Sequence, residues 1–301
     1  MKEFTSIAVG IDYSTPSACA LREASRIANW NDATLNCFHI FDEEIVEEFR
    51  SEGGFDEAAV KATALGHLEK FVAETLGAGH DIHCQVIVGH PYLSVLSTID
   101  ACKADLLVMG SHGLETEEAD QTGILAKRCA RKAPIDVLLV RERENEPFRG
   151  ILACVDFSEN SISAAHHAAS IAVQDQASLE LLHVYRSPTY NPAPAGMFGP
   201  TLPPIDTRGV FEALTSRLDK LANEISDAHG GLDIRATVKE STAVPREIID
   251  HLEAIGADLA VLGTRGRTTL QGFFAGTTAE KIIRRSPCSA LMVKPAGFGS
   301  K

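Results

Sequence analysis

The chain has 301 residues, which is enough for about two domains of ordinary size. Its composition, with 45% hydrophobic and 23% charged residues, is that of a soluble globular protein, and no segment approaches the ~20 apolar residues of a membrane span. The formal net charge of −13 disfavours nucleic acid and membrane surfaces as main partners, because both require a positively charged face.

The first half of the chain predicts strands that alternate with helices. Short apolar runs bounded by turn residues indicate strands, and "STPS" offers a serine that can cap the helix after the first of them. A variable loop is expected after the second strand. In chain order, the pattern predicts strands over about 5–11, 33–41, 82–88, 105–110 and 135–141, with a long helix over 56–77.

The second half repeats this order. Asp156 follows Asp12 by 144 residues, as His183 follows His39, and "ADLAVLGTRG" matches "ADLLVMGSHG" at an offset of 153. An internal duplication is the simplest account. Only the second half has a stretch rich in proline and glycine, 187–209, which is a candidate lid or docking loop or else a disordered insert. The equivalent strands are expected over about 150–156, 178–185, 233–239, 258–263 and 288–294, with a long helix over 207–228.

Strands that alternate with helices of ten or more residues form parallel sheets covered on both faces. We therefore expect two doubly wound α/β domains of Rossmann-like type, each with a five-stranded parallel sheet, over residues 1–144 and 145–301. The last strand of each half is apolar and would leave an exposed sheet edge, so we expect the halves to pack as an internal pseudo-dimer. Ligands of such sheets bind beyond the carboxyl ends of the strands, so Asp156 and the loop over 263–278 should face one crevice.

The stretch "GTRGRTTLQGFFAGTT", over 263–278, has the residues of a triphosphate cradle. Its glycines let backbone N–H groups turn toward an anion, and a helix N-terminus is expected after the last glycine. Its threonines add hydroxyl donors, and its arginines neutralise charge in an acidic protein. Glycines that merely join a strand to a helix would leave the threonines and arginines unexplained. The candidate phosphate-binding residues are Gly263, Arg265, Gly266, Arg267, Gly276, Thr277 and Thr278.

The same stretch resembles the universal stress protein family, whose nucleotide-binding members carry G-x2-G-x9-G-[ST]. The resemblance covers nearly the whole chain, as a tandem of two domains of the adenine nucleotide alpha hydrolase type whose last strands pair across a pseudo-twofold axis. It implies ATP as the ligand, with Asp156 on the ribose side and the backbone around Val184 at the adenine edge. It also implies that Thr278 and the N–H groups near Gly276 hold the phosphates, with a divalent ion such as Mg²⁺ bridging them.

The first half departs from this pattern. It keeps Gly110, Gly113 and Gly123 at the same spacing, but Ile124 stands where the second half has Thr277. Carboxylates in this loop would repel phosphates a few ångströms away by several kcal/mol at an effective dielectric constant of ~20. We therefore expect nucleotide in the second half only. The acidic residues of the first loop are Glu115, Glu117, Glu118 and Asp120.

No nucleophile–base pair and no metal-ligand cluster stands out in the sequence. His80, His83 and His90 lie close together but lack a pattern that would direct them to one metal. The sequence therefore favours a regulatory, nucleotide-binding stress protein with an unidentified client protein, and it leaves a further homodimer open. A slow ATPase or phosphotransferase in the second domain and a nucleotide-free interaction scaffold are the alternatives.

The seven cysteines are scattered, odd in number and without a CxxC pair, which favours reduced thiols. Cys154 and Cys288 are expected to be inert small hydrophobes. Because the first residues also show no export signal, the expected location is the cytoplasm.

Overall fold

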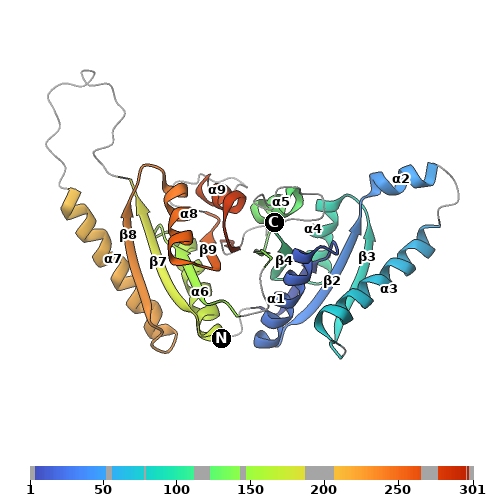
Figure 1. Ribbon diagram of the computed structural model, residues 1–301, viewed down its shortest axis with the longest axis horizontal. Coiled ribbons are helices and arrows are strands. Elements are labelled where there is room, and N and C mark those ends of the chain that lie inside the picture. Colours follow the sequence, from blue (N-terminus) through green and yellow to red (C-terminus); the bar gives the residue numbers. More distant parts are fainter. Residues whose placement is uncertain are drawn as a thin grey trace, which may run out of the picture.

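The computed structural model describes residues 4–51, 56–77, 79–111, 123–142, 147–186, 207–265, 277–295 and 297. Strands and helices alternate in both halves, as the sequence predicts (Figure 1). The strands are β1 (Ser6–Gly10), β2 (Thr34–Phe41), β3 (Ile82–Val88), β4 (Leu106–Gly110), β5 (Asp136–Val140), β6 (Gly150–Cys154), β7 (Ser178–Tyr185), β8 (Ile234–Glu240), β9 (Leu259–Gly263) and β10 (Ser289–Val293). The helices are α1 (Thr15–Asn31), α2 (Glu43–Ser51), α3 (Glu57–Leu76), α4 (Pro91–Ala101), α5 (Ile124–Lys132), α6 (Glu159–Asp175), α7 (Thr207–Ala228), α8 (Val244–Ile255) and α9 (Thr277–Arg285).

The strands form one sheet, in the order β3-β2-β1-β4-β5-β10-β9-β6-β7-β8. Neighbouring strands within each half are parallel, whereas β5 and β10 are antiparallel and join the halves. Leu138 pairs with Leu291, and these residues are equivalent at the offset of 153, so the pseudo-twofold axis passes through this pair. The predicted fold class and the internal pseudo-dimer are confirmed, and the two apolar last strands cover each other's edges.

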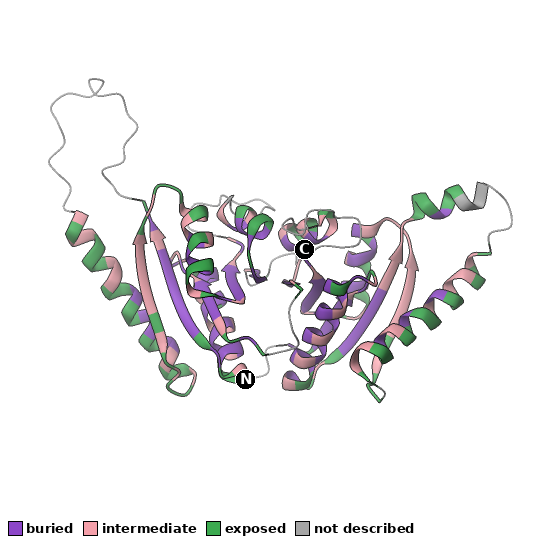
Figure 2. Cartoon of the chain, viewed as in Figure 1, coloured by how far each residue is buried: buried purple, intermediate pink, exposed green. Residues whose placement is uncertain are grey.

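Helices cover both faces of the sheet. α1, α3, α6 and α7 pack on one face, and α4, α5, α8 and α9 pack on the other. Successive residues of a strand point to opposite faces, so Ile7 and Val9 of β1 join the first core whereas Ala8 joins the second. Figure 2 shows the inner strands largely buried, the outermost strands β3 and β8 mostly half-buried, and the outer sides of the helices exposed. None of the helices in the described ranges is long and apolar enough to cross a membrane.

Two hydrogen bonds related by the pseudo-twofold axis flank the β5–β10 pair. The N–H of Arg141 donates to Oγ of Ser289 (3.2 Å), and the N–H of Lys294 donates to Oδ1 of Asp136 (2.7 Å). The ammonium group of Lys294 also donates to the carbonyl oxygen of Ala130 (2.6 Å), and burial lowers the pKa of Lys294 to about 8. Both ends of the strand pair are thus held by side chains of the opposite half.

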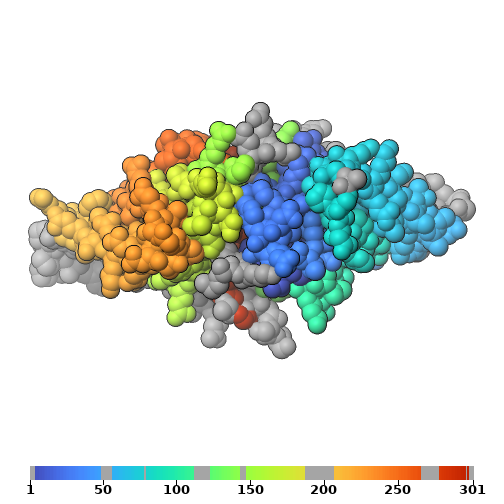
Figure 3. Space-filling model, turned by 90° about the horizontal axis from the view of Figure 1, so that it is seen from below, coloured from blue at the N-terminus to red at the C-terminus, as the bar shows by residue number. Residues whose placement is uncertain are grey.

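The first helices of the two halves also meet. The guanidinium of Arg26 on α1 forms an ion pair with Asp175 on α6 and lies 5.3 Å from the ring centroid of Phe148. The N–H of Phe148 donates to the other carboxylate oxygen of Asp175 (2.8 Å). Figure 3 shows the blue N-terminal elements packed directly against the yellow-green elements of the second half. Polar contacts therefore join the halves beside the sheet as well as within it.

Helix α2 occupies a segment in which the sequence predicts a variable loop, so that expectation is wrong at this point. Oδ1 of Asp42 accepts a hydrogen bond from the N–H of Glu44 (3.1 Å) where the helix begins. The acidic side chains of Glu43 and Glu44 in the first turn suit the positive end of the helix dipole. Val46 anchors the helix, because its side chain is buried. The helix projects from the outer end of the first half (Figure 1).

Candidate functional site

The strand order of the second half reverses direction at one point of the sheet. β7 follows β6 in the chain and lies on one side of it, whereas β9 lies on the other side, so the strand order reverses between β6 and β9. Ligands of doubly wound sheets bind at the carboxyl ends of the strands beside such a switch point. We call the residues that meet there, 155–158, 183–185 and 263–265, the switch-point region.

The turn after β6 holds Asp156 in a defined position. Oδ1 of Asp156 accepts hydrogen bonds from the N–H (3.0 Å) and the hydroxyl (2.6 Å) of Ser158, which also caps α6. Between them, Phe157 has a φ of 63°, in the left-handed region that bulky residues rarely adopt. Strain of this kind persists only where surrounding contacts compensate for it, and it is common at binding sites. The Asp156 carboxylate is thereby held beside the N-terminus of α6.

His183 supports this turn, a role that no motif in the sequence predicts. Its Nδ1 lies 2.7 Å from the carbonyl oxygen of Val155, and its ring centroid lies 4.6 Å from that of Phe157. The guanidinium of Arg217 on α7 lies 4.1 Å from the Phe157 ring centroid, within the range of cation–π attraction. The recurrence of histidine at positions 39 and 183 is the sequence signal that could have revealed this support.

The end of β7 extends past the end of β6. The carbonyl oxygen of Leu182 accepts a hydrogen bond from the N–H of Val155 (2.9 Å), toward β6, whereas that of Tyr185 accepts from Ser241 (2.9 Å), toward β8. Peptide groups of successive residues in a strand point to alternate sides. The N–H and C=O of Val184 therefore point toward the β6 side, beyond the end of β6, where a ligand could reach them.

The loop after β9 starts against the N-terminus of α6. A Cβ at Gly263 would lie 3.0 Å from the backbone carbonyl carbon of Asn160, so glycine is needed for this close approach. The N–H of Arg265 donates to Oδ1 of Asn160 (2.9 Å), and the Arg265 carbonyl oxygen accepts from the hydroxyl of Ser158 (3.3 Å). Asp156 and the start of the glycine loop thus lie together, as the sequence predicts for residues 263–265.

Of the other predicted loop residues, the structure describes only the two threonines. Helix α9 begins at Thr277, where a helix N-terminus is expected, and Thr278 is half-buried in its first turn. The structure therefore brings Asp156, Val184 and Arg265 to three neighbouring strand ends. The predicted site residues outside the described ranges are Gly266, Arg267 and Gly276.

Replacing Gly263 with alanine should destabilise the protein by about 1–3 kcal/mol, because the added methyl group must displace the backbone of α6. Urea unfolding measures this change. Gly66→Ala is the matched control, since nothing lies within 4 Å of a Cβ at that helical position. It should stabilise the protein by ~0.5–1 kcal/mol. Equal effects of the two changes would contradict the packing role of Gly263.

Comparison with known proteins identifies this architecture. The sequence profile of the universal stress protein family matches residues 3–141 and 147–294. The chain belongs to the universal stress protein family. The universal stress protein E of Photorhabdus laumondii is 24% identical over 324 aligned positions, which cover 99% of this chain and 97% of that protein. A universal stress protein of Methanocaldococcus jannaschii is 30% identical over 156 residues, which cover 52% of this chain and 87% of that protein.

Solved structures share the fold over the whole chain. A functionally unknown protein from Pseudomonas aeruginosa is 20% identical, with a TM-score of 0.69 over 99% of this chain and 95% of that one. A universal stress protein from Archaeoglobus fulgidus is 15% identical, with a TM-score of 0.62 over 96% of this chain and 98% of that one. At these identities the likeness shows the fold alone.

The first universal stress protein half builds the same turn after its first strand. Oδ1 of Asp12 accepts hydrogen bonds from the N–H (3.0 Å) and the hydroxyl (2.5 Å) of Ser14, and Tyr13 has a φ of 63°. Nδ1 of His39 lies 2.7 Å from the carbonyl oxygen of Ile11. The turn is therefore a property of both universal stress protein domains and does not by itself distinguish a binding half from a non-binding half.

The start of α5 differs in sequence from the start of α9, its equivalent in the second half. Gly123 precedes α5 as Gly276 precedes α9 in the sequence, so this glycine is common to both halves. The Ile124 side chain that follows is 87% exposed and has no group that could donate a hydrogen bond to phosphate. The acidic segment 115–120 lies outside the described residues. Within the described residues, the difference between the two domains is thus the isoleucine that begins α5 in place of the threonine that begins α9.

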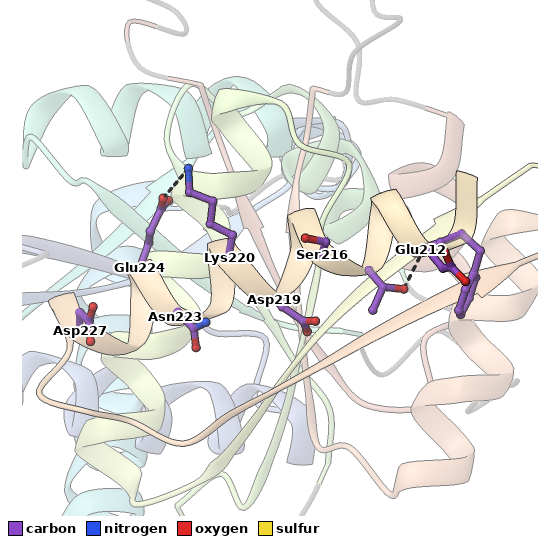
Figure 4. A pocket seen from close by; sticks show the side chains of 9 residues that line it. Glu212, Ser216, Asp219, Lys220, Asn223, Glu224 and Asp227 are labelled. Carbon is purple, nitrogen blue, oxygen red and sulfur yellow. Dashed lines mark hydrogen bonds and ion pairs between the residues drawn. The ribbon is translucent and has the colours of Figure 1, made fainter. Parts of the chain in front are cut away.

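A hollow of about 620 Å³ lies along the solvent side of α7 (Figure 4). Glu212, Asp219 and Asp227 line it, together with an ion pair between Lys220 and Glu224 (3.7 Å). A surface with this excess of carboxylates repels phosphate. The hollow therefore does not compete with the switch-point region as a nucleotide site.

Two thiols of the second half are kept protonated by burial. Burial raises the pKa of Cys154, at the end of β6, to about 12, and it raises the pKa of Cys288 to about 11. Both therefore stay protonated near neutral pH. These pKa values support the expectation that the two residues act as small hydrophobes.

Proposed function

We propose that the second half binds ATP in the switch-point region and that the protein acts as a regulatory, nucleotide-binding stress protein. The observation that carries this proposal is the meeting of Asp156, the backbone of Val184 and the start of the glycine loop at neighbouring strand ends. The carboxylate can accept hydrogen bonds from ribose hydroxyls. The N–H and C=O of Val184 can pair with the polar edge of adenine, and the loop leads from there toward the phosphates.

The phosphates would follow the loop from Gly263 to Thr277. The N-terminus of α9 favours anions, because the backbone N–H groups of a helix's first turn can donate to an anion and the helix dipole is positive at this end. Arg265 and Arg267 add positive charge to an acidic protein. Mg²⁺ bound with the nucleotide would offset phosphate charge, and it would need few protein ligands because it usually keeps water and phosphate oxygens around it. The residues present therefore fit a triphosphate with its ion.

The same arrangement favours binding over turnover. Ser158 holds the Asp156 carboxylate through two hydrogen bonds, which suits a group that positions a ligand. We expect bound ATP to stay intact, with phosphate release far slower than the ~1 s⁻¹ at the lower end of typical enzymes. Phosphate release from ATP mixed with an excess of the protein measures this directly. Release at enzyme-like rates would identify an ATPase instead.

One ATP should bind per chain. The first half lacks the hydroxyl of Thr277, and losing a hydrogen bond to a charged phosphate costs about 1.5–3 kcal/mol. The acidic residues of the first loop add repulsion, so affinity there should fall by more than about a hundredfold, at ~1.4 kcal/mol for each factor of ten. Titration calorimetry should therefore give a stoichiometry near one. Two equivalent sites would contradict the proposed difference between the domains, and no binding would overturn the proposed function.

A further inference from the structure

Two cysteines of the first half face each other across neighbouring strands. Cys37 on β2 and Cys84 on β3 are direct register partners. Both side chains lie on the sheet face that packs against α1 and α3. Neighbouring strands are ~4.8 Å apart, which falls within the ~4.4–6.8 Å between the Cα atoms of disulfide-bonded cysteines. The spacing of this register pair therefore lies within the range of disulfide-bonded cysteines.

The two thiols differ in exposure and in acidity. Cys37 is fully buried, whereas Cys84 is half-buried on the outermost strand of the sheet. A hydrogen bond from the Cys37 thiol stabilises the Cys84 thiolate and lowers the pKa of Cys84, although burial and the charge of Glu69 oppose this effect. The same hydrogen bond and burial raise the pKa of Cys37. Cys84 is therefore the nucleophile of the pair, and Cys37 is the protonated partner behind it.

The fold does not require cysteine at these positions. The equivalent register pair in the second half is Leu181 with Ala236, on β7 and β8. Apolar side chains therefore fill the same place in the second core. Packing of the first core therefore does not by itself require a cysteine at either position.

The thiol pair lies near the turn after β1. This turn corresponds to the turn after β6, which holds Asp156 in the proposed nucleotide site. The pKa of Tyr13 is raised by burial and then by the nearby charge of Cys84. The Tyr13 ring packs against His39 (4.7 Å between centroids) and edge-on against Phe71 (5.4 Å). A change in the charge of Cys84 would thus act on Tyr13, which lies in the turn after β1.

We propose that Cys37 and Cys84 form an oxidation site of the first half, which closes to a disulfide when the protein meets a hydroperoxide. The Cys84 thiolate attacks the hydroperoxide, so an S–O bond forms as the O–O bond breaks, and the departing oxygen takes the proton that the Cys84 thiol had lost. The Cys37 sulfur then attacks the Cys84 sulfur. The S–S bond forms, the S–O bond breaks, and the hydroxyl leaves as water with the Cys37 proton. Two thiols lose two electrons, and the hydroperoxide is reduced to an alcohol and water.

Peptide mapping of the oxidised full chain tests the proposal. The reduced protein is treated with hydrogen peroxide, its remaining thiols are alkylated, and its digest is analysed by mass spectrometry. We expect the peptides of Cys37 and Cys84 to be linked in most molecules and to separate again after treatment with dithiothreitol. Before oxidation, Cys84 should be alkylated at least about tenfold faster than Cys102, a half-buried thiol whose pKa is raised by burial, because rates follow the thiolate fraction.

Serine variants separate the two roles. In Cys37→Ser, Cys84 should accumulate as a sulfenic acid that dimedone traps, and in Cys84→Ser, Cys37 should stay reduced. Cys102→Ser is the matched control and should leave the link intact. The proposal is overturned if wild-type Cys37 and Cys84 remain unlinked at a peroxide dose that oxidises Cys102, or if Cys84 links preferentially to another cysteine. None of these outcomes depends on nucleotide binding.

Discussion

Gly276→Glu should abolish ATP binding. In the proposed site the new carboxylate would stand beside the phosphates, and two like charges ~4 Å apart repel by about 4 kcal/mol at an effective dielectric constant of ~20. Since ~1.4 kcal/mol corresponds to a factor of ten, affinity should fall by more than about a hundredfold. Titration calorimetry with ATP and Mg²⁺ measures this loss.

Gly123→Glu is the matched control, because Gly123 is the equivalent position of the first half. It should leave ATP affinity within about twofold of wild type, since nucleotide is not expected there. The thermal midpoints of both variants show whether they are folded. Unchanged affinity in a folded Gly276→Glu variant would remove the glycine loop from the site, and loss of binding in Gly123→Glu would place nucleotide in the first half.

Arg26→Ala should destabilise the whole chain by about 3 kcal/mol at pH 7, because it leaves the Asp175 carboxylate buried without its cation. The Asp175 side chain is only 1% exposed, so water cannot replace the guanidinium. The variant also loses the contact between Arg26 and the Phe148 ring. Since these contacts join the two halves, urea unfolding followed by fluorescence of Trp30 should report the loss.

The loss should depend on pH. Burial raises the pKa of Asp175, whereas Arg26 lowers it, so removing Arg26 raises the pKa further. A carboxyl whose pKa rises on folding costs stability when it is ionised, and this cost falls as pH drops through the folded-state pKa. The difference between the variant and wild type should therefore shrink from pH 7 toward pH 4. A loss that stays constant over this range would contradict an origin in the Asp175 charge.

Arg208→Ala is the control for removing an arginine. Arg208 pairs with Glu212 one turn away on the exposed surface of α7, where such pairs contribute at most ~0.5 kcal/mol. Its removal should leave unfolding almost unchanged at every pH. A similar loss in both variants would mean that the effect comes from the net charge of the chain and not from the contact between the halves.

Local patterns in the sequence predicted most of the elements. β7 and α7 have the bounds expected from the apolar pattern, because each spans one uninterrupted run of strand or helix periodicity. Helix α2 was missed, since the cap at Asp42 and the buried side chain of Val46 are weak signals in an acidic stretch. Gly263 was predicted for the right region, but its close approach to Asn160 became visible only once α6 was packed against β9.

The sequence by itself determined the duplication, the alternation of strands and helices, and the contrast between the two glycine loops. These features depend on residues near one another in the chain or on a comparison of one half with the other. Tertiary structure alone decided the close approach of Gly263 to α6, the register that pairs Cys37 with Cys84, and the contact of Arg26 with Asp175. Each of these joins segments whose relative position is set by the packing of the whole sheet and its helices, and no local preference encodes it.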